Sequence, residues 1–218
     1  MQHNNIKIIE GKTPVLVSAP HAVAIRKKET DRTYIRMAEK RADKIVEEIC
    51  ARNGAWGILT TADGVLDGWQ KHVYKDYKDF VKKLVKDKGI ELVIDVHGAK
   101  KTRPFYMDYD FMIPDKHPND IYVEKLLKRT FAQHFPPEEL SHKFYRKIKG
   151  SGKKTLTFYV RKHLKIPAVQ LEINKALKEE VETFEKVIKM LHEFIETYEN
   201  TFTGVQPQKE VLYGKTPS

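Results

Sequence analysis

The sequence predicts one α/β domain with a mixed, mostly parallel central sheet and helices on both of its faces. Short runs rich in β-branched residues alternate with longer amphipathic runs along the 218 residues, a pattern typical of strands connected by helices within one sheet. The run Ile90–Val96 is almost continuously apolar, as expected of a central strand that is covered on both faces. We therefore expect a three-layer domain over residues 1–202, followed by a C-terminal tail over residues 203–218.

The first half of the chain is expected to begin with two short strands joined by the turn Gly11–Pro14. A helix capped by Thr30 or Asp31 should follow and run to about Arg52, because apolar residues recur along one of its faces. The residues of that face are Tyr34, Ala38, Ala42, Ile45 and Ile49. The strands expected in this half are Ile6–Ile9, Val15–Ser18 and Trp56–Thr61.

The second half repeats the alternation of strand and helix, which predicts a mostly parallel or mixed central sheet. The strands expected here are Ile90–Val96, Phe105–Ile113 and Ala168–Ile173. The helices expected in the second half of the chain are Tyr74–Lys88, Asn119–His134 and Leu177–Thr201. Residues 136–154 show the least regular pattern.

The chain is basic, with 40 Lys and Arg against 30 Asp and Glu and a net charge of +10. A basic surface attracts nucleic acids, anionic membranes and acidic small molecules. Here the lysines are scattered in short groups among acidic residues, without an arginine-rich arm or an aromatic-basic RNA motif. We therefore expect a solvated lysine-rich exterior and no specific nucleic-acid partner. A non-enzymatic basic protein that binds nucleic acid or another anionic partner is the alternative.

The single cysteine, Cys50, excludes a disulfide within the chain and a thiolate-rich metal site. No apolar run approaches the roughly 18 residues that a membrane span needs, so no membrane partner is expected. The start Met1–Asn5 lacks the basic-then-apolar pattern of a secretory signal. These features favour a cytoplasmic protein, and they leave its oligomeric state open.

Polar clusters interrupt or follow three of the apolar strands. Ligands of open α/β sheets bind at the carboxyl ends of the strands, so these clusters should meet at one edge. The clusters are Ser18–His21, Asp95–Gly98 and Leu171–Asn174. This edge is the predicted active site.

Two histidines from separate strands and one carboxylate form a donor set that suits zinc, with a fourth position left for water or substrate. The histidines are His21 and His97. Asp31 and Glu29 are the two acids available soon after His21, and Asp31 has the competing use of capping its helix. Asp95 lies two residues before His97 and is a candidate acceptor for the second nitrogen of that imidazole.

Glu172 places a carboxylate inside the otherwise apolar run Val169–Ile173. Burying an ionised carboxylate without partners is costly, so its presence indicates a metal, a cationic partner or catalysis. A general base for zinc-activated water is the role that we predict. An ion pair with one of the lysines is the structural alternative.

These clusters, in this order, resemble those of the N-formylglutamate amidohydrolase family, which is related in fold to the zinc carboxypeptidases and to the aminoacylase and desuccinylase group. The resemblance covers about residues 14–200 and implies a phosphorylase/hydrolase-like three-layer fold. The elements that carry the resemblance are Pro20-His21, Thr30-Asp31, Asp95-Val96-His97-Gly98 and Glu172-Ile173-Asn174.

The resemblance implies that His21, Asp31 and His97 hold one zinc ion, with Glu29 as the alternative to Asp31. Glu172 would take the place of the carboxypeptidase-type catalytic glutamate. The implied reaction is hydrolysis of the amide of an N-acyl amino acid similar to N-formylglutamate, and a carboxypeptidase-like peptidase acting on short peptides is the alternative. Arg103 is our first candidate to bind the substrate carboxylate, because a guanidinium grips a carboxylate with two hydrogen bonds. The other candidates for that role are Arg26, Arg146 and Arg161.

Overall fold

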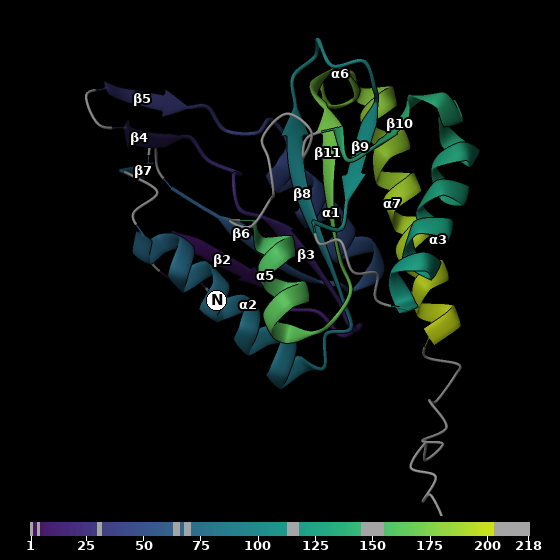
Figure 1. Cartoon of the computed structure of the whole chain (residues 1–218), viewed down its shortest axis with the longest axis horizontal. Coiled ribbons are helices and arrows are strands. Elements are labelled where there is room, and N and C mark those ends of the chain that lie inside the picture. The colour runs from purple at the N-terminus through teal and green to yellow at the C-terminus, as the bar shows by residue number, and fades with distance from the viewer. Residues whose placement is uncertain are drawn as a thin grey trace, which may run out of the picture.

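A mixed, mostly parallel sheet of eight strands forms the centre of the computed structural model, in the order β1-β2-β6-β3-β8-β11-β9-β10 (Figure 1). The structure describes residues 2–3, 5–29, 32–62, 66–67, 71–112, 118–144 and 155–202. Four neighbouring strands of this sheet, β6, β3, β8 and β11, are parallel to one another. Strand β9 is parallel to β10. The strands of the sheet are β1 Gln2–His3, β2 Ile6–Ile9, β3 Val15–Ala19, β6 Trp56–Thr60, β8 Leu92–Ala99, β9 Met107–Asp110, β10 Leu140–His142 and β11 Ala168–Asn174. The predicted fold class is confirmed.

Helices cover both faces of this sheet (Figure 1). The helices over one face are α1 Ala42–Asn53, α3 Pro118–His134 and α7 Val181–Phe202. The helical segments over the other face are α2 Lys71–Lys88, α5 Leu156–Tyr159 and the π-helical turn η2 Val160–Leu164. Two further short helices are η1 Pro137–Glu139 and α6 Lys175–Glu179. Within the described part of the chain, no helix is both long enough and apolar enough to cross a membrane.

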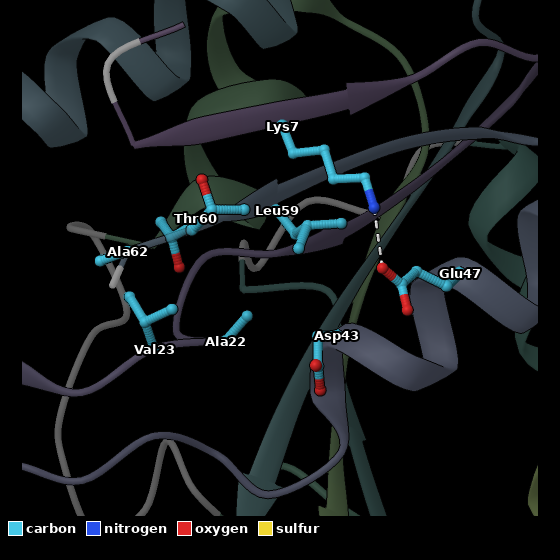
Figure 2. A pocket seen from close by; sticks show the side chains of 9 residues that line it. Lys7, Ala22, Val23, Asp43, Glu47, Leu59, Thr60 and Ala62 are labelled. Atoms are coloured by element: carbon cyan, nitrogen blue, oxygen red, sulfur yellow. Dashed lines mark hydrogen bonds and ion pairs between the residues drawn. The ribbon is translucent and has the colours of Figure 1, made fainter. Parts of the chain in front are cut away.

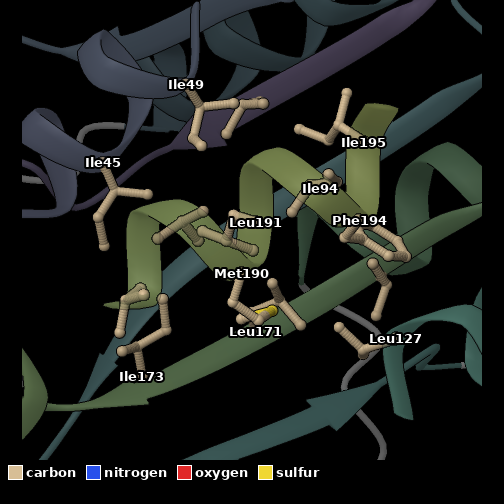
Figure 3. Packing of buried hydrophobic residues seen from close by; sticks show 14 of the residues in the cluster. Ile45, Ile49, Ile94, Leu127, Leu171, Ile173, Met190, Leu191, Phe194 and Ile195 are labelled. Carbon is tan, nitrogen blue, oxygen red and sulfur yellow. The ribbon is translucent and has the colours of Figure 1, made fainter. Parts of the chain in front are cut away.

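The larger apolar core lies between the sheet and helices α1, α3 and α7 (Figure 3). Ile94 of β8 and Leu171 and Ile173 of β11 are at most 1% exposed and face this core. Phe194 of α7 packs into the same cluster and is fully buried. Since burying one such side chain contributes about 1.5–3 kcal/mol, this face fixes which side chains of each strand point inward.

The expected helix from residue 30 to residue 52 is wrong in its first half. Residues Arg32–Arg36 form strand β5, which pairs antiparallel with β4 Ile25–Glu29. β4 in turn pairs parallel with β7 Leu66–Asp67, which completes a second sheet of three strands. The run Thr33-Tyr34-Ile35 is β-branched and aromatic, and this preference for strand prevails over the helical spacing.

Helix α1 starts only at Ala42, after Arg41 in a left-handed conformation with φ 58°. Tyr34 and Ala38 are therefore exposed, contrary to expectation. The remaining residues of the predicted face, Ala42, Ile45 and Ile49, are fully buried as expected.

The other predicted elements are confirmed with small shifts of their ends, except at three places. Residues 155–164 form α5 and η2, which the sequence pattern did not predict. Strand β10 lies in the segment that we expected to be irregular. The long C-terminal helix is two helices, α6 and α7, because the backbone of Glu180 is extended between them. The tail predicted over residues 203–218 lies outside the described residues.

We expect Phe194→Ala to lower the free energy of unfolding by about 3–5 kcal/mol, because it opens a cavity in the larger core. Urea unfolding followed by circular dichroism measures this change. Lys189→Ala, at an exposed position of the same helix, is the matched control and should change it by less than about 0.5 kcal/mol. An equal effect of the two substitutions would contradict the assigned core.

Candidate metal centre and catalytic site

One half of the sheet face beneath α2 and α5 is polar, although its residues are almost completely buried. Side chains alternate along each strand, so residues that are paired in register line up across this face. The first polar row comprises Ser18, Asp95, Gln170 and Asp110. The next row, one step nearer the carboxyl ends of β8 and β11, comprises His97, Glu172 and Asp108. The polar rows lie at the edge of the sheet where the sequence predicted the site.

His21, Glu39 and His97 bring one ligand atom each to within 4.8 Å of one another. His21 lies two residues beyond β3, His97 lies in β8, and Glu39 lies three residues before α1. The rings of His21 and His97 are 5.1 Å apart between centroids. Two imidazoles and one carboxylate are the donor set of a catalytic zinc site, so the chemistry of these residues fits zinc. We call these three residues the His-Glu-His cluster.

Backbone contacts hold Glu39 against the two histidines. Its backbone N–H donates to the carbonyl of His21 over 3.0 Å, and its Oε2 accepts from the N–H of Gly98 over 2.9 Å. The same Oε2 lies 3.3 Å from Nδ1 of His97. Burial opposes the charge of Glu39, but His97, His21 and Arg36 prevail and lower its pKa to about 2. Glu39 is therefore ionised, as a metal ligand must be.

Asp95 fixes the orientation of the His97 ring. Its Oδ2 lies 3.2 Å from Nε2 of His97, which leaves Nδ1 facing Glu39. The hydroxyls of Ser18 and Thr157 also donate to Asp95, at 3.0 and 3.4 Å. Burial alone would lower the pKa of His97, but Asp95 and then Glu39 raise it well above its ordinary value. This carboxylate–imidazole pair is the arrangement that orients metal-bound histidines, as the sequence suggested for Asp95.

Gly98 lets Glu39 approach the end of β8. A Cβ at this position would lie 2.8 Å from Nζ of Lys178 and 3.1 Å from Cβ of Glu39. The close approach therefore explains why a glycine directly follows His97.

Glu172 lies beside His97, because the two residues are paired in register between β11 and β8. It is 4% exposed, and its Oε1 accepts a hydrogen bond from the side chain of Gln170 over 2.8 Å. Burial raises the pKa of Glu172 to about 7, with a further contribution from Glu39. A carboxyl group with a pKa near neutrality suits the transfer of protons at physiological pH.

The guanidinium of Arg36 contacts the cluster, and the sequence analysis did not predict this contact. Its Nη1 lies 3.1 Å from Nε2 of His21, and its Nη2 lies 2.5 Å from Oε1 of Glu39. Strand β5 supplies this residue, so it was hidden by the mistaken helix. The strand-forming run Thr33-Tyr34-Ile35 is the signal that would have revealed it.

The guanidinium of Arg103 lies 5.6 Å from the ring centre of Phe144, and its role in binding substrate stays a prediction. Arg161 is buried in an ion pair with Asp120 and donates to the carbonyl of Phe111, which is a structural role. Arg26 is exposed on β4, and Arg146 lies outside the described residues.

The acid that the structure brings to the histidines is Glu39, which the sequence analysis did not name. Asp31 lies outside the described residues, as does the side chain of Glu29 on β4. The late start of α1 explains the difference. The expected pattern has an acid at the start of the helix. The helix begins at Ala42, and Glu39, three residues earlier, is the last acid before it.

A pocket of about 190 Å³ lies behind the loop that carries His21 (Figure 2). Ala22 and Val23, directly after His21, form one wall, and Asp43 and Glu47 of α1 form another. Lys7 bridges it by an ion pair of 2.8 Å to Glu47. None of the three residues of the His-Glu-His cluster lines this pocket, so the pocket is separate from the cluster.

No protein-family model and no curated protein matches the sequence. Solved structures match its fold. The N-formylglutamate amidohydrolase from Ralstonia eutropha JMP134 superposes with a TM-score of 0.64, covering 92% of this chain and 99% of its own at 12% identity. The gene product Atu2144 from Agrobacterium tumefaciens gives 0.62, with 92% and 97% covered and 10% identity. A metallo-carboxypeptidase from Burkholderia cenocepacia gives 0.57, with 92% and 66% covered and 12% identity.

The chain therefore has the three-layer fold of hydrolases that act on amide and peptide bonds. Within that class, its fold is similar to those of N-formylglutamate amidohydrolase and the metallo-carboxypeptidases. The resemblance seen in the sequence is thus confirmed at the level of the fold.

We expect Glu39→Ala to reduce zinc binding at least 10-fold, whereas Asp31→Ala should leave it nearly unchanged. The reason is that Glu39 brings its carboxylate to both histidines. Zinc content after dialysis, measured by mass spectrometry on equal amounts of each variant, shows which of the two substitutions weakens zinc binding more. If Asp31→Ala lost the metal and Glu39→Ala kept it, the acid ligand would be Asp31.

The raised pKa of Glu172 predicts a pH-dependent effect on stability in protein kept metal-free with a chelator. The folded state holds this proton up to about pH 7, whereas the unfolded chain releases it near 4.5. The contribution to stability is therefore complete below pH 4.5 and is lost as the pH rises through 7. Glu172→Gln removes this titration, so it should gain stability relative to the wild type by on the order of 3 kcal/mol between about pH 4 and pH 8. Urea unfolding at both pH values measures the difference, and a difference independent of pH would contradict the assignment.

Proposed function

We propose that this protein is a zinc-dependent amidohydrolase that cleaves the amide bond of a small anionic N-acyl amino acid similar to N-formylglutamate. The observation that carries the proposal is the His-Glu-His cluster, with Glu172 beside His97 on the neighbouring strand. A donor set for zinc and a buried carboxyl group next to it are the parts that metal-assisted amide hydrolysis requires.

Some residues of this site would bind the zinc ion, and others would take part in the reaction. His21, Glu39 and His97 would hold one zinc ion, which when bound lowers the pKa of water and polarises a carbonyl group. Asp95 keeps the ring of His97 in the orientation that directs Nδ1 toward Glu39. Glu172 accepts a proton from the attacking water and passes it to the leaving nitrogen, so that one carboxyl group serves as base and then as acid.

Arg36 supports an anionic substrate. Its side chain is 30% exposed beside Glu39, and it brings a positive charge to the mouth of the cluster. A guanidinium has five N–H donors, more than its two contacts here use, so it can also receive a substrate carboxylate. With the net charge of +10, this cation favours acidic substrates over neutral ones.

A peptidase of carboxypeptidase type is the second candidate, favoured by the similarity of this fold to a metallo-carboxypeptidase. The two candidates share the site and differ in the substrate. Release of free amine from N-formyl and N-acetyl amino acids, compared with release from dipeptides and tripeptides, separates them.

We expect Glu172→Gln to keep zinc and to melt at or above the wild-type temperature at pH 7 while turnover falls by about 100- to 10,000-fold. Glutamine preserves the size of the side chain but cannot accept the water proton, and a general base contributes about this factor. Amine release from N-formylglutamate, or from the substrate that the panel identifies, measures turnover.

Glu182→Gln, at a side chain that is 83% exposed on α7, is the matched control and should behave as the wild type. Wild-type protein that binds no stoichiometric zinc would overturn the metal assignment. Near-normal turnover of Glu172→Gln would overturn the mechanism instead.

A further inference from the structure

Lys178 is a buried cation that the proposed mechanism does not use. It lies on α6 and is 1% exposed, although lysine is almost never fully buried in proteins without a partner. Among the described residues it is the one lysine that is buried to this extent. A buried ammonium group is costly, so this position suggests that the charge of Lys178 has a functional role.

Asn174 fixes the helix that carries Lys178. The side chain of Asn174 accepts from the N–H of Ala176 over 2.9 Å and so caps α6 directly after β11. Its amide group also donates to the carbonyls of Arg103 and Phe105, at 3.2 and 2.8 Å. The helix is thereby held over the carboxyl end of β11, two residues beyond Glu172.

The ammonium of Lys178 lies beside Gly98, the residue that follows His97 on β8. Its Nζ is 2.8 Å from the position that a Cβ on Gly98 would take, and Gly98 both follows His97 and donates to Glu39. Burial lowers the pKa of Lys178 below its ordinary value, and the carboxylates of Glu39 and Glu172 oppose this shift from their positions in the site. The cation is therefore next to the His-Glu-His cluster rather than at a distance from it.

Lys178 differs in one respect from Arg161, the other buried lysine or arginine of the described chain. Arg161 is paired with Asp120 and donates to the carbonyl of Phe111. Lys178 makes no hydrogen bond and has no carboxylate within 4.0 Å among the described residues. Its three N–H donors are thus available to a ligand.

We propose that Lys178 is a catalytic residue whose ammonium donates a hydrogen bond to the substrate carbonyl oxygen as that oxygen becomes an oxyanion. This inference rests on the proposed function. A position beside His97, Glu39 and Glu172 favours the scissile carbonyl over a more distant substrate carboxylate. A preorganised cation in a site that excludes water is an effective way to stabilise charge that develops in the transition state.

The step balances without a proton from Lys178. The water oxygen bonds to the carbonyl carbon, the π pair moves onto the carbonyl oxygen, and the water proton goes to Glu172. When the pair returns, the C–N bond breaks, and Glu172 gives its proton to the leaving nitrogen. Lys178 stays protonated throughout and stabilises the oxyanion between these two steps.

Binding of inorganic phosphate, used as a tetrahedral oxyanion probe, tests this role without knowledge of the substrate. Isothermal titration calorimetry compares wild type, Lys178→Met and the control Lys175→Met in zinc-loaded and in chelator-treated protein. Lys175 is on the same helix with its side chain 51% exposed. We expect Lys178→Met to bind phosphate at least tenfold more weakly while zinc content and melting temperature stay near the wild-type values. Lys175→Met should match the wild type.

Equal phosphate affinity of Lys178→Met and wild type would overturn the proposal. Loss of zinc together with loss of stability in both Lys178→Met and Lys178→Gln would also overturn it, because Lys178 would then support Glu39 and Glu172 rather than a ligand. Failure of the wild type to take up zinc would refute the proposed function separately, and the chelator-treated samples would still compare the anion affinities. On an accepted substrate, Lys178→Met should lower kcat by about 100- to 1,000-fold with KM changed by less than about threefold.

Discussion

The parallel register between β8 and β11 is the constraint on which the candidate site depends. It pairs His97 with Glu172, and it therefore brings an imidazole that we propose to ligate zinc and a buried carboxyl group together from segments 75 residues apart in the chain. A slip of one residue would turn Glu172 toward the core beneath α7. Apolar side chains on the opposite face, Ile94 of β8 and Leu171 of β11, oppose such a slip because they are already buried there. The packing of the core thus sets the geometry of the site.

The polar half of the sheet is stable because most of its buried carboxyl groups are satisfied. Asp95 accepts from Ser18 and Thr157 and pairs with His97. Asp108 likewise accepts the backbone N–H of Phe144. Carboxylates held in this way act as supports, since moving one would leave an unsatisfied buried charge. Glu172 has the raised pKa that incomplete compensation produces, which suits the proton-transfer role that we propose for it.

The sequence predicted the sheet better than it predicted the segment between its first two polar clusters. Strand positions follow from apolar runs, and Glu172 was found because a carboxyl group interrupts one of them. Strand β5 was missed because Tyr34 continues the helical spacing of the apolar residues that follow it, while β4 pairs with β7 between residues 41 positions apart, such as Ile25 and Leu66. The local spacing of apolar residues cannot predict a strand partner that is distant in the sequence. The correction also accounts for Arg36, which reaches the cluster only because Arg32–Arg36 is a strand.

Glu39 could not have been identified from spacing, because backbone contacts set its position. Its N–H donates to the carbonyl of His21, and its carboxylate accepts from the N–H of Gly98, 59 residues later. Both partners are main-chain groups, so no pattern of side chains in the sequence predicts these contacts. What the sequence does show is the glycine that makes the second contact possible, since a Cβ there would meet both Glu39 and Lys178. Gly98 therefore belongs to the candidate site, because it allows an acid from the chain before α1 and an ammonium from α6 to reach the same point on β8.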